Sequence, residues 1–135
     1  DESLSSPPVI EDERADQNPD ADLFDWDKVI EQVGGSEAMI VDLAQLFREE
    51  SPKIMQAIRT SIDEKDLPEV QRNAHTLKGS ARIFAAEPAA EAAFRIEIMG
   101  RDKDLAEVEE AWDHLEYEIG RLMPALEKRF SKTTD

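Results

Sequence analysis

The spacing of apolar residues restricts this chain to helices from residue 23 onward. Between residues 105 and 126 the apolar positions recur at alternating intervals of three and four, which is the repeat of one helix face. The positions are Leu105, Val108, Trp112, Leu115, Ile119, Leu122 and Leu126. No segment after residue 22 shows the strict apolar–polar alternation of a half-buried strand. The sequence therefore predicts an all-α fold.

Glycine, serine and proline mark the boundaries of the first helices. A short helix that begins near Leu23 should end at the glycine pair 34–35, and Ser36 is a good N-cap for the next helix. Pro52 lies inside that second helix and cannot donate a backbone hydrogen bond, so we expect a kink or a break there. We expect the inner face of the second helix to carry Met39, Leu43, Leu46, Phe47, Ile54, Ile58 and Ile62.

Two more helices form a hairpin before the long last one. Asp66 should cap the third helix, with Pro68 in its first turn, and Pro88 should open a fourth that runs to about Gly100. The inner stripe of the third helix is Val70, Ala74, Leu77, Ala81 and Phe84, and that of the fourth is Ala89, Ala92, Ala93 and Ile96. The pattern predicts an up-down-up-down antiparallel four-helix bundle with a short extra N-terminal helix, over residues 22–132.

The first 21 residues differ from the rest in composition. They are rich in Ser, Pro and acids and have almost no periodic apolar residues, so we expect an acidic disordered linker or tail. The sequence starts with Asp rather than Met. We therefore expect a fragment of a longer protein, in which this domain is attached to the C-terminal side of something larger.

The charge and the residue types exclude several classes of function. A net charge of −16 disfavours nucleic acids and anionic membranes as partners. There is no cysteine, which removes disulfides and thiolate metal sites. No apolar run approaches the roughly 18 to 20 residues that cross a bilayer. We expect no membrane insertion of this segment.

One side of the third helix carries a histidine and several cations on an otherwise acidic chain. His75 lies about 100° from the apolar stripe, and on the same side of the helix, at spacings of three, four or seven from it, lie Gln71, Arg72, Lys78, Gly79 and Arg82. A neutral imidazole is a nucleophile near pH 7, and Lys78 and Arg82 would neutralise a phosphoryl group on it. Gly79 weakens the helix by about 1 kcal/mol relative to alanine, which suggests that another protein must approach His75 closely. We expect the Lys78 side chain to be exposed.

The fourth helix should bring a carboxylate to the height of this histidine. Residues 75 and 97 are equidistant from the turn at residue 86, so Glu97 lies level with His75 in an antiparallel hairpin. Its carboxylate would accept the proton of one ring nitrogen and leave the other nitrogen free to react. The spacing does not say whether Glu97 points towards His75. Phe94 and Arg95 lie near the height of Lys78 and Leu77 across the hairpin, and either is a candidate for the rim of a docking surface.

Residues 74–81 read AHTLKGSA, and Glu97, which follows Ile96, lies 22 positions past the histidine. This combination resembles the histidine-containing phosphotransfer (HPt) domain of two-component phosphorelays. The resemblance extends over about residues 23–130, and its specific part is residues 71–97. It implies that His75 is phosphorylated on its outer ring nitrogen, that Lys78 contacts the phosphoryl group and that Glu97 orients the ring. It also implies that Gly79 admits the partner, and we place Gln71, Arg72 and Arg82 in the docking surface.

Two positions depart from the family pattern. Ala85 stands where family members often have glycine, and Glu97 stands where many phosphorelay members have glutamine. The chemotaxis-kinase branch also uses glutamate there, so Glu97 leaves the branch open.

The resemblance implies a phosphocarrier that exchanges a phosphoryl group with the aspartate of response-regulator receiver domains in a multistep relay. The sequence has no glycine-rich nucleotide loop and no magnesium-binding acid cluster, so we expect no kinase or ATPase activity, no cofactor and no metal. The expected partners are a receiver domain and a cognate histidine kinase, in the same or another chain. We expect the isolated domain to be a monomer. We expect it to lie in the cytoplasm, either by itself or as the cytoplasmic C-terminal part of a membrane-bound hybrid sensor kinase.

Two other functions stay open at this stage. One is the phosphoacceptor domain of a chemotaxis-type histidine kinase, and the other is a helical adaptor that binds receiver domains without being phosphorylated. His114 has no Lys-Gly context, and we interpret it as a surface or boundary residue. The two histidines are 39 positions apart without further ligands, which does not favour a metal site.

Overall fold

The computed structural model describes residues 23–130, so the predicted acidic linker (1–21) lies outside the described residues. Within 23–130 the chain forms helices and no strand, as expected for an all-α protein. The helices are α2 (Trp26–Gln32), α3 (Glu37–Asp63), α4 (Leu67–Ile83), α5 (Glu87–Asp102) and α6 (Val108–Phe130).

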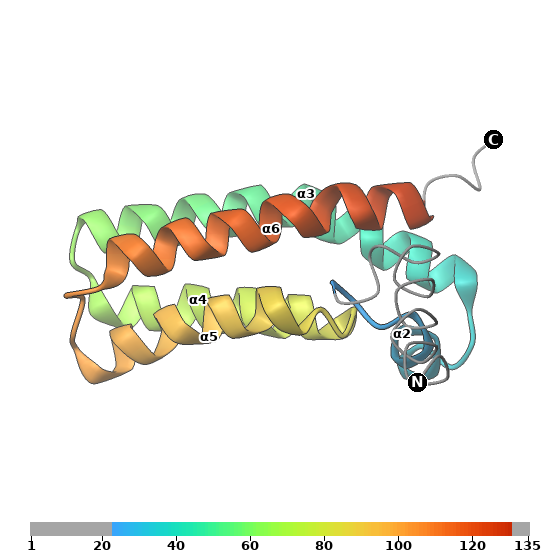
Figure 1. Cartoon of the computed structure of the whole chain (residues 1–135), viewed down its shortest axis with the longest axis horizontal. Coiled ribbons are helices and arrows are strands. Elements are labelled where there is room, and N and C mark those ends of the chain that lie inside the picture. The colour runs from blue at the N-terminus through green and yellow to red at the C-terminus, as the bar shows by residue number, and fades with distance from the viewer. Residues whose placement is uncertain (1–22, 131–135) are drawn as a thin grey trace, which may run out of the picture.

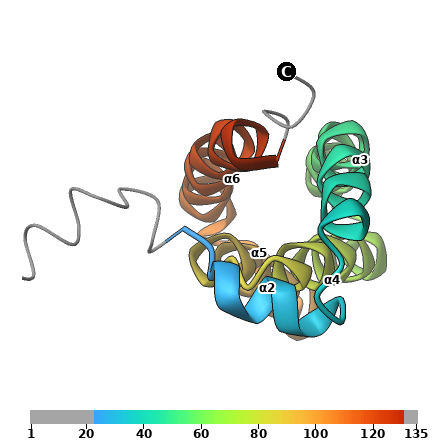
Figure 2. The same ribbon diagram turned by 90° about the vertical axis from the view of Figure 1, so that its right-hand side faces the viewer.

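The four long helices form the predicted antiparallel bundle. They run alternately up and down, joined by short turns (Figure 1). In the end-on view the helices surround one axis, and α3 packs against both α4 and α6, while α5 packs against the same two (Figure 2). Helices α4 and α5 make the most extensive contact of any pair. The bundle with a short extra helix is therefore confirmed.

The short helix α2 lies across the end of the bundle where α4 turns into α5 (Figure 2). Gln32, its last residue, donates hydrogen bonds from its side-chain amide to the carbonyls of Arg82 and Ile83, at 3.4 and 3.2 Å. These two carbonyls belong to the last turn of α4, which has no helical partner for them. Helix α2 thus caps α4 and fixes the end of the hairpin.

The capping residues stand where the sequence places them. Ser36 accepts a hydrogen bond from the Met39 backbone N–H at 3.2 Å, and Asp66 accepts one from the Glu69 N–H at 3.3 Å. Each side chain satisfies a backbone donor that the first helical turn leaves free.

Helix α3 continues past Pro52, and its inner face differs from the predicted one. It runs through Pro52 as one helix of 27 residues, without the break that we allowed for, and its N-terminal part slopes away from the rest in Figure 1. Its inner face also lies slightly to one side of the predicted one. Met39 and Leu46 are half exposed, at 50% and 52%, whereas Ile40 and Ala44 are buried.

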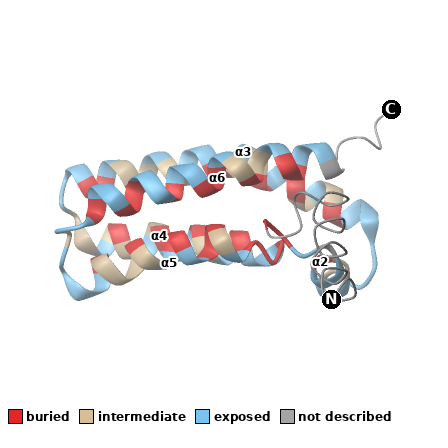
Figure 3. Ribbon diagram, in the orientation of Figure 1, coloured by how far each residue is buried: buried red, intermediate tan, exposed pale blue. Residues whose placement is uncertain are grey.

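The inner stripes of the other helices are buried as predicted. Buried positions line the inward sides of the four long helices in Figure 3. All the predicted stripe residues of α4 and α5 are buried, and five of them are alanines, which let these two helices approach closely. Leu105 is only half-buried, because it precedes the start of α6 at Val108.

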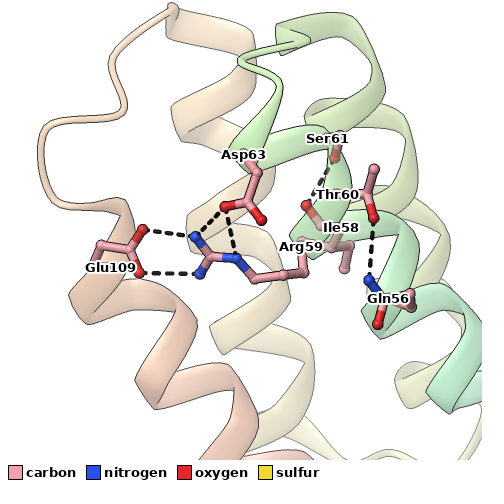
Figure 4. Close-up of polar contacts among 7 residues, drawn as sticks. All are labelled: Gln56, Ile58, Arg59, Thr60, Ser61, Asp63 and Glu109. Carbon is pink, nitrogen blue, oxygen red and sulfur yellow. Dashed lines mark hydrogen bonds and ion pairs between the residues drawn. The ribbon is translucent and has the colours of Figure 1, made fainter.

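A cluster of charges joins α3 to α6 at the end of the bundle opposite α2 (Figure 4). The Arg59 guanidinium donates to both carboxylate oxygens of Glu109, at 3.0 and 2.8 Å, and to Asp63 at 2.6 Å. It also lies 5.4 Å from the ring centroid of Trp112. Glu109 and then Asp63 raise the pKa of Arg59, which stays charged. The planar guanidinium fork matches two carboxylates at once, so this contact fixes how α6 lies on α3.

The turn after α4 contains a strained alanine. Ala85 has a φ of +51°, and hydrogen bonds from Ala85 N–H to the Arg82 carbonyl and from Ala86 N–H to the Ala81 carbonyl close the turn as a Schellman motif. This left-handed conformation costs an L-residue other than glycine roughly 1–2 kcal/mol. The conformation explains why a glycine suits this position.

Replacing Ala85 with glycine should therefore stabilise the domain. We expect the free energy of unfolding to rise by about 0.5–1 kcal/mol, after the greater freedom of glycine in the unfolded chain is deducted. Urea unfolding followed by circular dichroism measures this change. Ala38→Gly, at an exposed position in the first turn of α3, should lower stability instead. A loss of stability in Ala85→Gly would contradict the strain.

Candidate phosphoacceptor site

His75 and Glu97 meet across the α4–α5 hairpin. The distance between His75 Nδ1 and Glu97 Oε2 is 2.9 Å. The imidazole is largely exposed, at 64% of its side-chain surface, whereas the Glu97 side chain is 13% exposed. Among residues 23–130 no side chain is hydrogen-bonded to Nε2, the other ring nitrogen. The carboxylate therefore favours the tautomer with the proton on Nδ1 and leaves a lone pair on Nε2.

Lys78 is not exposed, so our expectation for it was wrong. Its side chain is 12% exposed, and its ammonium lies 2.8 Å from Glu97 Oε1 and 4.6 Å from the ring centroid of Phe94. The apolar stem of a lysine can follow a neighbouring helix while its charge meets a carboxylate. One carboxylate thus links His75 through Oε2 and Lys78 through Oε1.

The ionisation of Glu97 follows from these contacts. Burial alone raises the pKa of Glu97, but the hydrogen bonds and charges of Lys78 and His75 outweigh it, so the pKa lies below its ordinary value. Glu97 is therefore a carboxylate at neutral pH. A carboxylate can only accept hydrogen bonds, which is what the proton on Nδ1 needs.

Gly79 lies in open space one turn from His75. A Cβ atom at Gly79 would have no other atom within 4 Å, beyond its own helix backbone and chain neighbours. The packing of this domain therefore gives no reason for a glycine there. A reason for this glycine must therefore come from outside the packing of the domain.

The other predicted docking residues surround His75 unevenly. Arg72 is exposed and forms an ion pair with Glu69 on its own helix, and the Arg82 side chain is exposed near the end of α4. Gln71 is half-buried under α5. With Lys78 turned inward, the basic face that the helical wheel predicts consists of Arg72 and Arg82 alone.

Two hollows flank the histidine helix. An open concavity beside the imidazole is lined by Pro68, Gln71, Arg72, His75, Thr76 and Glu97. A mainly apolar groove between α3 and α4 lies on the other side of Thr76 and includes the exposed side chains of Leu46 and Ile83. Sequence reasoning missed Pro68, Thr76, Leu46 and Ile83 as surface features. The helical wheel places Thr76 beside His75 and was the available signal for it.

The two candidates for the docking rim and the second histidine differ in where they lie. Arg95 forms an ion pair with Glu110 of α6 at 3.3 Å, whereas Phe94, 37% exposed, contacts Lys78 at the site. His114 is 3.5 Å from Glu118 on its own helix. In the described part of the chain, no group of three or more His, Asp or Glu side chains is arranged to hold a metal ion. None of the helices in residues 23–130 combines the length and apolarity that a bilayer crossing requires.

Comparison with known proteins agrees with this geometry. The family model of the Hpt domain matches residues 42–125, which is more than half of the chain. The fold is similar to the crystal structure of the HPT domain from a sensor hybrid histidine kinase of Shewanella, with a TM-score of 0.73 and 16% identity. That match covers 84% of this chain and 97% of the Shewanella domain. No curated protein sequence matches significantly.

Hpt domains are phosphocarriers of two-component signalling, and they interact with response-regulator receivers. The matched segment contains α4 and α5 complete, and with them His75, Lys78, Gly79 and Glu97. The bundle, the exposed imidazole and the carboxylate behind it fit a domain of this kind. Because the family model matches most of the helical region of this chain, the chain belongs to the Hpt domain family.

Proposed function

We propose that His75 accepts a phosphoryl group on Nε2 and exchanges it with the aspartate of a receiver domain, as one step of a multistep phosphorelay. In the forward step a bond forms between Nε2 and phosphorus while the bond between phosphorus and the aspartyl oxygen breaks. The aspartate leaves as a carboxylate, and the proton on Nδ1 stays beside Glu97. The return step reverses these changes.

The observation that carries the proposal is the Glu97 carboxylate between His75 Nδ1 and Lys78 Nζ, at 2.9 and 2.8 Å. It aims one lone pair of an exposed imidazole outward and holds a compensating positive charge beside it. Phosphorylation of Nε2 leaves Nδ1 as a donor with more positive character, which strengthens its hydrogen bond to Glu97. Phosphoryl transfer depends mainly on such positioning and charge stabilisation.

Lys78 has a different role in this proposal from the one that the family resemblance implies. Its ammonium is held by Glu97 in the unphosphorylated domain. It keeps Glu97 ionised and offers its remaining N–H groups towards the site. A direct contact with the phosphoryl group would require the lysine to leave or share Glu97.

A transfer assay tests the proposal directly. A receiver domain phosphorylated with a radioactive small-molecule phosphodonor is mixed with the purified chain. We expect label on this chain that is acid-labile and base-stable, which distinguishes phosphohistidine from acyl phosphate and phosphoserine. ATP alone should give no label. Absence of transfer from every receiver of the source organism would support the adaptor function instead.

Gly79→Gln should weaken receiver binding and slow transfer. A glutamine side chain would occupy the open space one turn from His75, where the receiver must approach, and we expect a loss of roughly tenfold or more in affinity. The helix itself should gain up to about 1 kcal/mol, because glycine is a poor helix former.

Gly120→Gln provides a matched control for this prediction. Gly120 is also exposed and helical with no atom within 4 Å of an added Cβ, but it lies on α6. The Gly120→Gln substitution should stabilise the domain without changing the rate of phosphoryl transfer. Binding by isothermal titration calorimetry and single-turnover transfer rates give both readings. Unchanged transfer in Gly79→Gln would remove partner access as the reason for this glycine.

A further inference from the structure

Gly100 marks the place where α5 comes closest to the backbone of α4. A Cβ atom at Gly100 would lie 2.8 Å from the Gln71 backbone nitrogen, 3.0 Å from the Leu67 carbonyl oxygen and 3.1 Å from the Gln71 Cα. All three atoms belong to the main chain of a helix and cannot rotate away as a side chain would. An ordinary contact begins near 3.4 Å, so α5 would have to move by about half an ångström to admit a methyl group.

This requirement distinguishes Gly100 from the other helical glycines. Neither Gly79 nor Gly120 has any atom within 4 Å of an added Cβ. Gly100 is buried, although glycine is a poor choice for the interior of a helix. Its presence is explained by the separation between α4 and α5.

The close approach lies one helical turn from the site on both helices. Gly100 follows Glu97 by three residues on α5, and Gln71 precedes His75 by four residues on α4. Three residues of helix correspond to a rise of about 4.5 Å. A displacement of α5 at Gly100 therefore reaches Glu97 nearly undiminished, because a helix is stiff over one turn.

We propose that Gly100 is a positioning residue, which sets the depth of α5 against α4 so that Glu97 reaches both His75 and Lys78. The hydrogen bond between His75 and Glu97 is 2.9 Å long, and the ion pair between Lys78 and Glu97 is 2.8 Å long, and both are short for contacts to a charged group. An outward shift of half an ångström would lengthen at least one of them beyond the favourable range. The expected effect of Gly100 on phosphoryl transfer rests on the proposed function. Its expected effect on the orientation and tautomer of the His75 ring does not.

The first test reads the imidazole itself. Nitrogen-15 NMR of the histidine ring at pH 8 distinguishes the tautomer with a proton on Nδ1 from that with a proton on Nε2. We expect His75 to be largely the Nδ1–H form in the parent chain, and Gly100→Ala to shift it towards a mixture of both. Gly120→Ala should leave the ring signals of His75 unchanged. This measurement stands even if no receiver transfers phosphate.

The second test separates positioning from general loss of packing. We expect Gly100→Ala to slow transfer about tenfold at a temperature where circular dichroism shows a folded domain. In a Glu97→Ala background the same change should have no further effect, because the group through which it acts is gone. A purely structural role would give the same additional slowing in both backgrounds and would overturn the proposal.

A second background, Gly120→Ala, controls for a loss of stability in Gly100→Ala. Gly120→Ala replaces an exposed helical glycine and should stabilise α6. Gly100→Ala is therefore also compared within Gly120→Ala, so that the variant is measured folded. Unchanged ring signals and unchanged transfer would contradict the inference. Failure to fold in both backgrounds would also count against it, since Gly100 would then serve the fold rather than the site.

Discussion

Replacing His75 with glutamine should abolish the transfer of phosphoryl label from a receiver to this chain. A glutamine amide fills a similar volume and can still donate to Glu97, but its nitrogen has no lone pair available for attack on phosphorus. The imidazole is 64% exposed, so the substitution should change the free energy of unfolding by no more than about 0.5 kcal/mol. The expected loss is complete, because no other group takes over covalent attachment.

The second histidine provides the control for this experiment. His114 is 43% exposed and pairs with Glu118 on α6, away from the hairpin. His114→Gln should keep full transfer and give label with the same acid lability. Label that persists in His75→Gln, or that disappears in His114→Gln, would show that His75 is not the phosphoacceptor.

Lys78→Ala should both slow transfer and destabilise the domain. The substitution leaves the Glu97 carboxylate, 13% exposed, without its nearest positive charge, and it removes the contact of the ammonium with Phe94. Leaving a largely buried charged group without its partner costs about 1–3 kcal/mol. If a similar amount is lost in the transition state, transfer slows by roughly 5- to 150-fold. Chemical denaturation and single-turnover kinetics measure the two effects.

Lys78→Ala should also change how the free energy of unfolding depends on pH, in a direction that follows from the pKa of Glu97. The pKa of Glu97 in the parent chain is lowered, so its contribution to stability is present above the pKa of the unfolded chain and is lost as pH falls through the folded one. In Lys78→Ala the burial of Glu97 remains while a charge that offsets it is gone. The pKa of Glu97 should rise, and the loss of stability as the pH falls from the pKa of the unfolded chain through that of the folded one should shrink.

An exposed lysine serves as the reference for Lys78. Lys53 is 73% exposed, and within residues 23–130 it pairs only with Glu50 on its own helix. Lys53→Ala should stay within about 0.5 kcal/mol of the parent and transfer at the parent rate. Equal effects of the two substitutions would show that the link between Lys78 and Glu97 does not matter to stability or transfer.

The helices were predictable because each carries its own boundary signals. Ser36 and Asp66 cap the helices that they were expected to cap, and the stripe of α4 from Val70 to Phe84 is buried throughout. The inner face of α3 was less certain. Apolar residues on that helix cover a broad arc, and periodicity alone cannot decide that Ile40 faces the core while Met39 does not.

Two features of the site were readable from residue numbers alone: His75, Lys78 and Gly79 share one side of a helix, and Glu97 lies at the height of His75. Both follow from counting residues along helices of fixed rise and turn. Two further features emerge only when the helices are packed together: α5 is rotated so that Glu97 points at His75, and Lys78 folds inward to the same carboxylate.

The physical reason is that spacing fixes position within one helix but not the rotation and separation of two. Those depend on how the surfaces pack, here on alanines and on Gly100 against the main chain of α4. A lysine also has a long flexible stem, so its charge goes where a buried carboxylate needs it, whichever side its Cα is on.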